Sequence, residues 1–342
     1  MRRQLLLASA VLALVALVVE ALVFAASFSL DELFDEREKV LRALDPDGLR
    51  AFAQGRGDPV LGWTRHGPET VEARDCQGTE VVYRFDVDGA RVDPAFAAAS
   101  ARVIAVGDSY TAGAEVGDAG TWPARLAARL GVAVVNHGVG GYDPTQSLLR
   151  LDQKAPLYPR AEVAVLGIMF ENVHRMVNSY RPVLKDDARP YLLKPYMAGG
   201  VLVPHPGREP LEDFTVFLRH AHAAFDDDFW ARPPRRFPYT LALLRGLRSN
   251  TFVFRELPRD LRAYGVPEHS WTFEAERYQL ELIAAFEHFA EVSRRHGLRP
   301  VAVFFPRSRF DTSSASAFLA AQQHRFPAGL VAAGAGAAAI DW

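Results

Sequence analysis

The sequence contains only one cysteine, Cys76, in 342 residues. A single cysteine excludes an intrachain disulfide and any metal site built from a cysteine cluster. The zinc-hydrolase motif His-Glu-x-x-His is absent, and the glycine-rich stretch 138–143 does not fit Gly-x-Gly-x-x-Gly because Asp143 holds the last position. We therefore expect no metal and no cofactor.

A strong net charge is also lacking. The 39 Lys and Arg residues nearly balance the 41 Asp and Glu residues, which gives a formal net charge of −2. No basic run follows the first few residues, so the sequence has no electrostatic signature of a nucleic-acid partner. At 49% hydrophobic residues, the chain is long enough for one sizeable core and an inserted subdomain.

A long apolar run stands at the N-terminus. Arg2 and Arg3 precede a mostly apolar segment over residues 5–30, which Glu20 interrupts. This segment exceeds the roughly 20 residues that span a bilayer, and the arginine pair favours a cytoplasmic N-terminus. We therefore predict that residues 1–30 form an uncleaved signal anchor in the cell membrane, with the body periplasmic or extracellular. A cleaved signal peptide, with a small-residue site at 23–26, is the alternative.

Residues 31–100 are predicted to form a stalk followed by a small β-rich leader. The pattern over 33–44 indicates an amphipathic helix that Asp45-Pro46 ends. Residues 62–63 and 80–85 are expected to be extended, with a turn over 86–89. No catalytic grouping is apparent in this stretch.

The most informative motif is Val103-Ile-Ala-Val-Gly-Asp-Ser109. Residues 103–106 are apolar and mostly β-branched without alternation, which is typical of a strand buried on both faces of a parallel sheet. Gly107 permits a tight exit, and Ser109 then begins the next element, where backbone N–H groups can bind an oxyanion. We predict that Ser109 is a nucleophile, with a simple helix-capping role as the alternative.

Two further strands end in polar or glycine-rich loops. The first, over 132–135, ends in Asn136-His-Gly-Val-Gly-Gly141. The second, over 162–166, ends in Gly167-Ile-Met-Phe-Glu-Asn172. Because the carboxyl ends of parallel strands meet at one edge of a sheet, we expect these loops to lie near Ser109.

These three blocks resemble those of the SGNH hydrolases, also called GDSL-type esterases and lipases. The resemblance implies a three-layer α/β/α, flavodoxin-like fold with a parallel sheet over 101–342. It also implies Ser109 as nucleophile and an oxyanion hole formed by the Ser109 N–H, the Gly141 N–H and the Asn172 amide. The family usually has Gly-x-Asn-Asp in the third block, whereas Asn172 lies five residues after Gly167. Asn178 is therefore a second candidate.

The fourth block departs from the family. SGNH hydrolases carry Asp-x-x-His after the last core strand, and no Asp-x-x-His occurs in these residues. We expect the sequence to be truncated before that block, after a last short strand over 339–342, and to have little esterase activity without the base. His137 and His174 are the histidines nearest to the predicted site in sequence, and each is a candidate for the base.

Residues 180–270 interrupt the βα pattern with recurrent proline and aromatic residues. We predict an inserted helical segment that either forms part of the substrate pocket or fills its own core. A helix over 271–296, a strand over 300–305 and a helix over 311–324 follow. The alanine-rich stretch 328–339 is expected to contribute only packing.

Together these features predict a membrane-anchored serine hydrolase that cleaves carboxylic esters through an acyl-enzyme on Ser109. Its expected substrate is a small-molecule ester or an acylated glycan of the cell envelope. An acyltransferase of the cell envelope is one alternative, because a hydroxyl can intercept the same acyl-enzyme. A non-catalytic envelope or carbohydrate-binding protein that lacks the base is the other.

Overall fold

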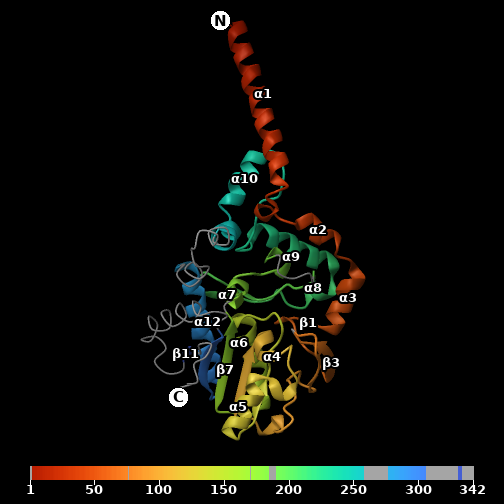
Figure 1. The fold of residues 1–342 in the computed structure, drawn as a ribbon, viewed down its shortest axis with the longest axis vertical. Coiled ribbons are helices and arrows are strands. Elements are labelled where there is room, and N and C mark those ends of the chain that lie inside the picture. Colours follow the sequence, from red (N-terminus) through yellow and green to blue (C-terminus); the bar gives the residue numbers. More distant parts are fainter. Residues whose placement is uncertain are drawn as a thin grey trace.

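The computed structural model describes residues 2–75, 77–169, 171–184, 190–257, 276–305 and 330–332. Its centre is a parallel sheet with helices on both sides (Figure 1). Four strands run in the order β6-β5-β7-β10, and the three-residue β11 pairs with the free edge of β10. The strands are β5 (Val103–Gly107), β6 (Val134–Asn136), β7 (Val163–Met169), β10 (Arg299–Phe305) and β11 (Leu330–Ala332). The predicted mixed α/β class with a parallel sheet is therefore confirmed.

Helices cover both faces of this sheet. Ile104 and Val106 of β5 belong to a large apolar cluster that includes residues of α6 and α12. Val103 and Ala105 of the same strand belong to a smaller cluster with Ala127 of α5 on the opposite face. The three helices are α5 (Trp122–Leu130), α6 (Pro144–Lys154) and α12 (Glu276–Arg295). Burial on both faces is the reason why β5 reads as an unbroken apolar run.

The C-terminal part of the sheet differs from the prediction in one respect. The stretch 328–339, expected to contribute only packing, contains β11, which pairs in parallel with Ala302–Phe304 of β10. The predicted helix over 311–324 and the predicted strand over 339–342 lie outside the described residues.

The segment after the N-terminal helix is built from short elements. These are η1 (Asp31–Leu33), α2 (Arg37–Arg42), α3 (Pro46–Gly55), β1 (Gly57–Asp58), β2 (Gly62–Trp63), β3 (Glu69–Arg74), β4 (Glu80–Phe85) and η2 (Ala98–Ser100). The extended pieces at 62–63 and 80–85 are confirmed. The helix predicted over 33–44 is found in part, as α2 over 37–42, because residues 34–36 are not helical, and Asp45 and Pro46 begin α3. The Asp45 carboxylate caps α3 by accepting from the Gly48 N–H at 2.8 Å, and Pro46 occupies the first turn.

The predicted insertion consists of small helices and one hairpin. Its elements are η5 (Arg181–Leu184), β8 (Tyr196–Ala198), β9 (Val201–Val203), α8 (Glu209–Glu212), α9 (Phe214–Asp227), α10 (Tyr239–Leu247) and a π-helical turn, η6 (Phe252–Glu256), and α7 (Glu171–Met176) precedes it. Tyr180, Phe217, Phe225 and Trp230 are buried in it, and Tyr180 packs edge-on against both phenylalanines. These aromatic side chains therefore fill a core.

The N-terminal helix α1 (Arg2–Ser27) projects away from the body (Figure 1). Its 26 residues correspond to about 39 Å of helix. By length and composition it is able to cross a membrane.

Candidate active site

Ser109 begins α4 (Ser109–Ala112), directly after the end of β5. Asp108 caps this helix, because its Oδ1 accepts from the Tyr110 N–H at 2.9 Å. The turn needs glycine at position 107, where a Cβ atom would lie 2.2 Å from Thr111 Oγ1 and 2.7 Å from the Gly167 carbonyl oxygen. The capping role falls to Asp108, so local helix capping does not account for the serine at position 109.

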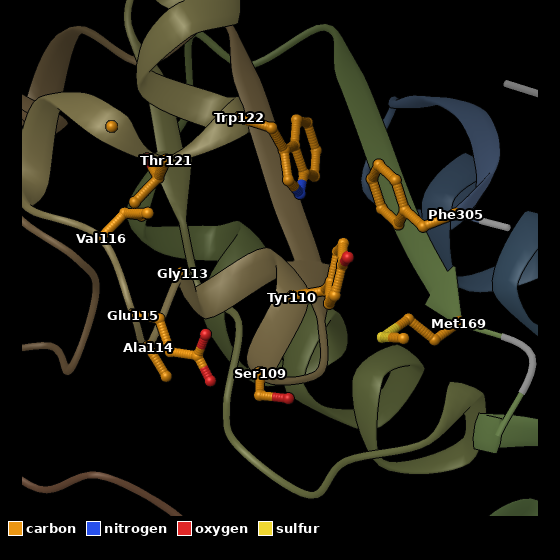
Figure 2. Close-up of a pocket in the computed structure, with 11 residues that line it drawn as sticks. Ser109, Tyr110, Gly113, Ala114, Glu115, Val116, Thr121, Trp122, Met169 and Phe305 are labelled. Carbon is orange, nitrogen blue, oxygen red and sulfur yellow. The ribbon is translucent and has the colours of Figure 1, made fainter. Parts of the chain in front are cut away.

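Ser109 lies in an open cleft of about 630 Å³ (Figure 2). The described lining consists of Ser109, Tyr110, Gly113, Ala114, Glu115, Val116, Gly120, Thr121, Trp122, Met169 and Phe305. Met169 ends β7 and Phe305 ends β10, so the carboxyl ends of three neighbouring strands meet at this cleft.

One wall of the cleft is aromatic. The Phe305 ring lies 5.7 Å from the Tyr110 ring and 5.7 Å from the Trp122 ring, measured between centroids. Tyr110 is 54% exposed, so its ring is available to a ligand. Among the lining residues that the structure describes, Glu115 supplies the one carboxylate, and Figure 2 shows it in the same part of the cleft as Ser109. Apolar or ring-shaped groups fit this wall.

A buried arginine from the leader holds the opposite side of the cleft in place. The Arg91 guanidinium donates to the carbonyl oxygens of Ala112 and Gly113 at 2.8 Å and of Val116 at 3.0 Å. It also pairs with Asp118 at 3.3 Å and stacks 4.5 Å from the Tyr83 ring centroid. Burial lowers the pKa of Arg91, whereas Asp118 acts in the opposite direction. Sequence reasoning missed this residue, because its hydrogen-bond partners lie 21 to 27 residues further along the chain.

The glycine-rich loop packs directly on α4. Asn136 Nδ2 donates to the Thr111 carbonyl at 2.7 Å, and its Oδ1 accepts from the Gly138 N–H at 3.0 Å. A Cβ atom at position 138 would lie 2.3 Å from the Ala112 nitrogen, so only glycine allows this approach. Gly141 adopts a left-handed conformation with φ of 85°. Within the described part of the chain, no hydrogen bond uses the backbone N–H of Gly141 or of Ser109.

Asn172 connects all three predicted blocks. Its Nδ2 donates to Asp108 Oδ2 at 3.0 Å and to the carbonyl oxygen of Tyr142, the residue after Gly141, at 3.3 Å. Its Oδ1 accepts from the Met169 N–H at 2.7 Å. The side chain is 1% exposed and, like Gly141, does not line the cleft. In this geometry Asn172 braces the Asp108 turn, and its role as an oxyanion donor stays a prediction.

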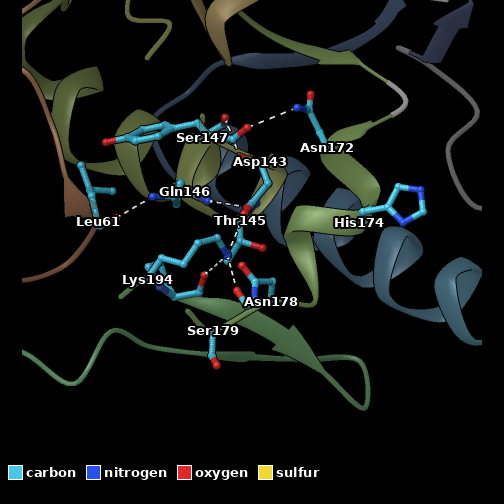
Figure 3. A network of polar contacts seen from close by, with 12 residues as sticks. Leu61, Asp143, Thr145, Gln146, Ser147, Asn172, His174, Asn178, Ser179 and Lys194 are labelled. Atoms are coloured by element: carbon cyan, nitrogen blue, oxygen red, sulfur yellow. Dashed lines mark hydrogen bonds and ion pairs between the residues drawn. The ribbon is translucent and has the colours of Figure 1, made fainter. Parts of the chain in front are cut away.

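The second candidate, Asn178, lies in a different network (Figure 3). Its Nδ2 donates to the Tyr180 carbonyl at 2.8 Å and to Asp228 Oδ2 at 3.1 Å. Its own carbonyl accepts from Lys194 Nζ at 2.7 Å. These contacts place Asn178 in the core of the insertion, with no contact to the Ser109 turn.

The two candidate histidines, His137 and His174, contact aromatic residues outside the cleft. His137 is fully buried, with Nε2 2.8 Å from the Tyr158 hydroxyl. Burial, together with the nearby Arg150 and Lys154 cations, holds its pKa well below the usual value. The His174 ring lies 5.4 Å from the Trp230 ring and points away from Asn172 in Figure 3. None of the described residues lining the cleft is a histidine.

Within the described residues, no group of three or more His, Cys, Asp or Glu side chains is arranged to hold a metal ion. No protein-family model and no curated protein matches this chain. The functional interpretation therefore depends on the geometry of the cleft and on the three sequence blocks around it.

Proposed function

We propose that the protein is a membrane-anchored serine esterase of the SGNH hydrolase type. The observation that carries the proposal is the position of Ser109 at the carboxyl end of β5, half-buried at an open cleft. Its hydroxyl takes part in no hydrogen bond among the described residues. A serine at the start of a helix, with a free hydroxyl and an unused backbone N–H of its own, is suited to acyl transfer.

The strand order supports the same proposal. Numbered along the chain, β5, β6, β7, β10 and β11 occupy the spatial order 2-1-3-4-5, which is the order of flavodoxin-like sheets. Such sheets bind ligands at the switch point between strands 1 and 3, outside their carboxyl ends. Here those strands are β5 and β7, and Ser109 and Met169 stand at their ends. With helices on both faces, this arrangement favours the three-layer α/β/α fold.

In the proposed reaction the Ser109 hydroxyl attacks the ester carbonyl carbon. The carbonyl oxygen becomes an oxyanion, which the N–H groups of Ser109 and Gly141 stabilise. Collapse of this intermediate breaks the ester bond, releases the alcohol and leaves the acyl group on Ser109, and water then releases the acid. The serine proton passes to a general base, which is not among the described lining residues of the cleft.

The cleft favours a carboxylic ester with an apolar acyl chain or a sugar ring. The rings of Tyr110, Trp122 and Phe305 offer one continuous wall for such a group. With α1 in the cell membrane and the body outside the cytoplasm, the substrate is a small-molecule ester or an acylated glycan of the envelope.

A phosphonylating probe tests the nucleophile directly. We expect an alkyl fluorophosphonate to modify Ser109 in the full-length, membrane-embedded protein, as located by peptide mass spectrometry. Ser109→Ala should abolish labelling and lower aryl-ester hydrolysis by roughly 10³-fold or more. Ser100→Ala, an exposed serine outside the cleft, is the matched control and should change neither. Labelling at a residue other than Ser109, or hydrolysis that Ser109→Ala does not change, would refute the proposal.

A further inference from the structure

The helix α10 packs beside α1 on one side (Figure 1) and against Phe34 and Phe252 on the other. The ring of Tyr239, at the start of α10, lies 4.7 Å from the ring of Phe24 in α1. Near the other end of α10, a Cβ atom at Gly246 would lie 2.6 Å from the Leu33 carbonyl oxygen. The start of α10 therefore contacts α1, and its end contacts η1, the turn that follows α1.

Glu20 fixes the start of α10 to α1. Its carboxylate accepts from the backbone N–H groups of Tyr239 and Thr240 and from the Thr240 hydroxyl. The residue before α10, Pro238, offers no side-chain cap, so Glu20 satisfies N–H groups that would otherwise lack partners. An acid that interrupts an apolar run thus has a specific partner more than 200 residues away in sequence.

The outer surface of α10 and of the turn before it is apolar. Phe237, Leu241, Leu244 and Leu247 are 63%, 43%, 58% and 38% exposed. This surface adjoins two exposed rings, that of Phe24 in α1, which contacts Tyr239, and that of Phe28 after α1, which packs against Phe24. Exposed arginines at 236, 245 and 248 flank it. Leucines and aromatic rings beside arginines are the composition of segments at a membrane interface.

The length of α1 sets the depth of α10. From Arg3 to Glu20 the helix rises about 26 Å, close to the roughly 30 Å thickness of the hydrocarbon core. If Arg3 stands at one boundary of that core, Glu20 stands near the other. The start of α10 is at the level of Glu20, so α10 occupies the interfacial layer on the side of the body.

We infer that residues 237–248 form a second membrane element that inserts into the interfacial layer of a phospholipid bilayer beside α1. The body is then held by two elements, which fixes its orientation relative to the membrane. The inference does not depend on the chemistry of Ser109, because it concerns a surface outside the cleft.

Lipid quenching of a site-specific fluorophore tests this inference. Cys76→Ser combined with Leu244→Cys gives one labelling site on α10, and Cys76→Ser combined with Val82→Cys gives a control site on β4 that is 54% exposed. Both full-length proteins are placed in phosphatidylcholine–phosphatidylglycerol vesicles that contain headgroup-region spin-labelled lipid. We expect quenching at position 244 to exceed that at position 82 by roughly twofold or more.

Equal, weak quenching at the two positions would overturn the inference. Efficient disulfide cross-linking of two copies through Cys at position 244, together with loss of quenching, would also overturn it. A second copy of the protein, and not lipid, would then cover α10. A label at position 241 provides an independent repeat on the same face, and it should follow position 244.

Discussion

Two groups of polar side chains lie at the carboxyl edge of the sheet, and they differ in whether the group at the centre of each has partners. Around Lys194, the ammonium contacts Asp143 Oδ2 at 2.8 Å and the carbonyl oxygens of Asn178 and Pro195 at 2.7 Å (Figure 3). Both Lys194 and Asp143 side chains are 0% exposed. At the cleft, by contrast, the Ser109 hydroxyl is half-buried and has no hydrogen bond to any described residue.

The difference separates structural from reactive polar groups. Lys194 Nζ donates two hydrogen bonds to carbonyl oxygens and forms an ion pair with Asp143, so this cation has no capacity left for a ligand. Burial lowers its pKa, whereas Asp143 acts in the opposite direction. The Ser109 hydroxyl, in contrast, is available to a ligand. The neighbouring side chains that support its turn, Asp108, Thr111 and Asn172, are fully buried.

The largest effect on stability is expected at Lys194. Lys194→Met leaves the Asp143 carboxylate buried without a cation, which should lower the free energy of unfolding by about 3–5 kcal/mol. Lys39→Met, at a lysine that is 80% exposed and paired with Glu36, is the control and should have little effect. Urea unfolding measures both. Equal values for the two variants would mean that the paired network is not structural.

The two asparagines give the next test. In the full-length protein, Asn172→Ala should lower kcat/KM for an aryl ester by roughly 10²- to 10³-fold, because the Asp108 turn loses its brace or the oxyanion loses a donor. Asn178→Ala should lower stability, since Asp228 and the Tyr180 carbonyl lose a donor, but should leave kcat/KM of the folded protein unchanged. The reverse result would assign the third block to Asn178.

Local patterns predicted the sheet well because each strand is a short apolar run followed by a turn. The runs at 103–106, 132–135, 162–166 and 300–305 all correspond to observed strands. The hairpin of β8 and β9 was missed, although Gly199 and Gly200 between them both have positive φ and are a usable turn signal. Asp45-Pro46 was misread because proline both ends helices and begins them.

Long-range partners were beyond the reach of sequence patterns. Arg91 reaches 21 to 27 residues along the chain to hold the wall of the cleft. Glu20 caps a helix 219 residues away. In sequence the first reads as an ordinary surface charge and the second as an unfavourable charge in an apolar run, because the fold alone supplies their partners.

Acidification should destabilise the protein through a buried histidine. Burial lowers the pKa of His205 to about 4, whereas its unfolded value is 6.5. Between these pH values the unfolded state binds more protons, so stability falls as the pH drops from 6.5 to 4, by at most about 3 kcal/mol. Urea unfolding at the two ends of this window should show the loss, and His205→Gln should reduce it. His222→Gln, at an exposed histidine, is the control.

The smallest effect is expected at Glu115, the exposed carboxylate of the cleft. Two charges about 4 Å apart in water interact by about 1 kcal/mol, which corresponds to roughly fivefold in rate. Glu115→Gln should therefore raise kcat/KM for an aryl hemisuccinate by up to about fivefold and leave the neutral aryl acetate unchanged. Glu38→Gln, an exposed glutamate on α2, should alter neither ester. In the wild-type protein, high salt should reduce the difference in kcat/KM between the acetate and the hemisuccinate, because salt screens exposed charges. Equal changes for both esters would show that Glu115 shapes the cleft and does not act through its charge.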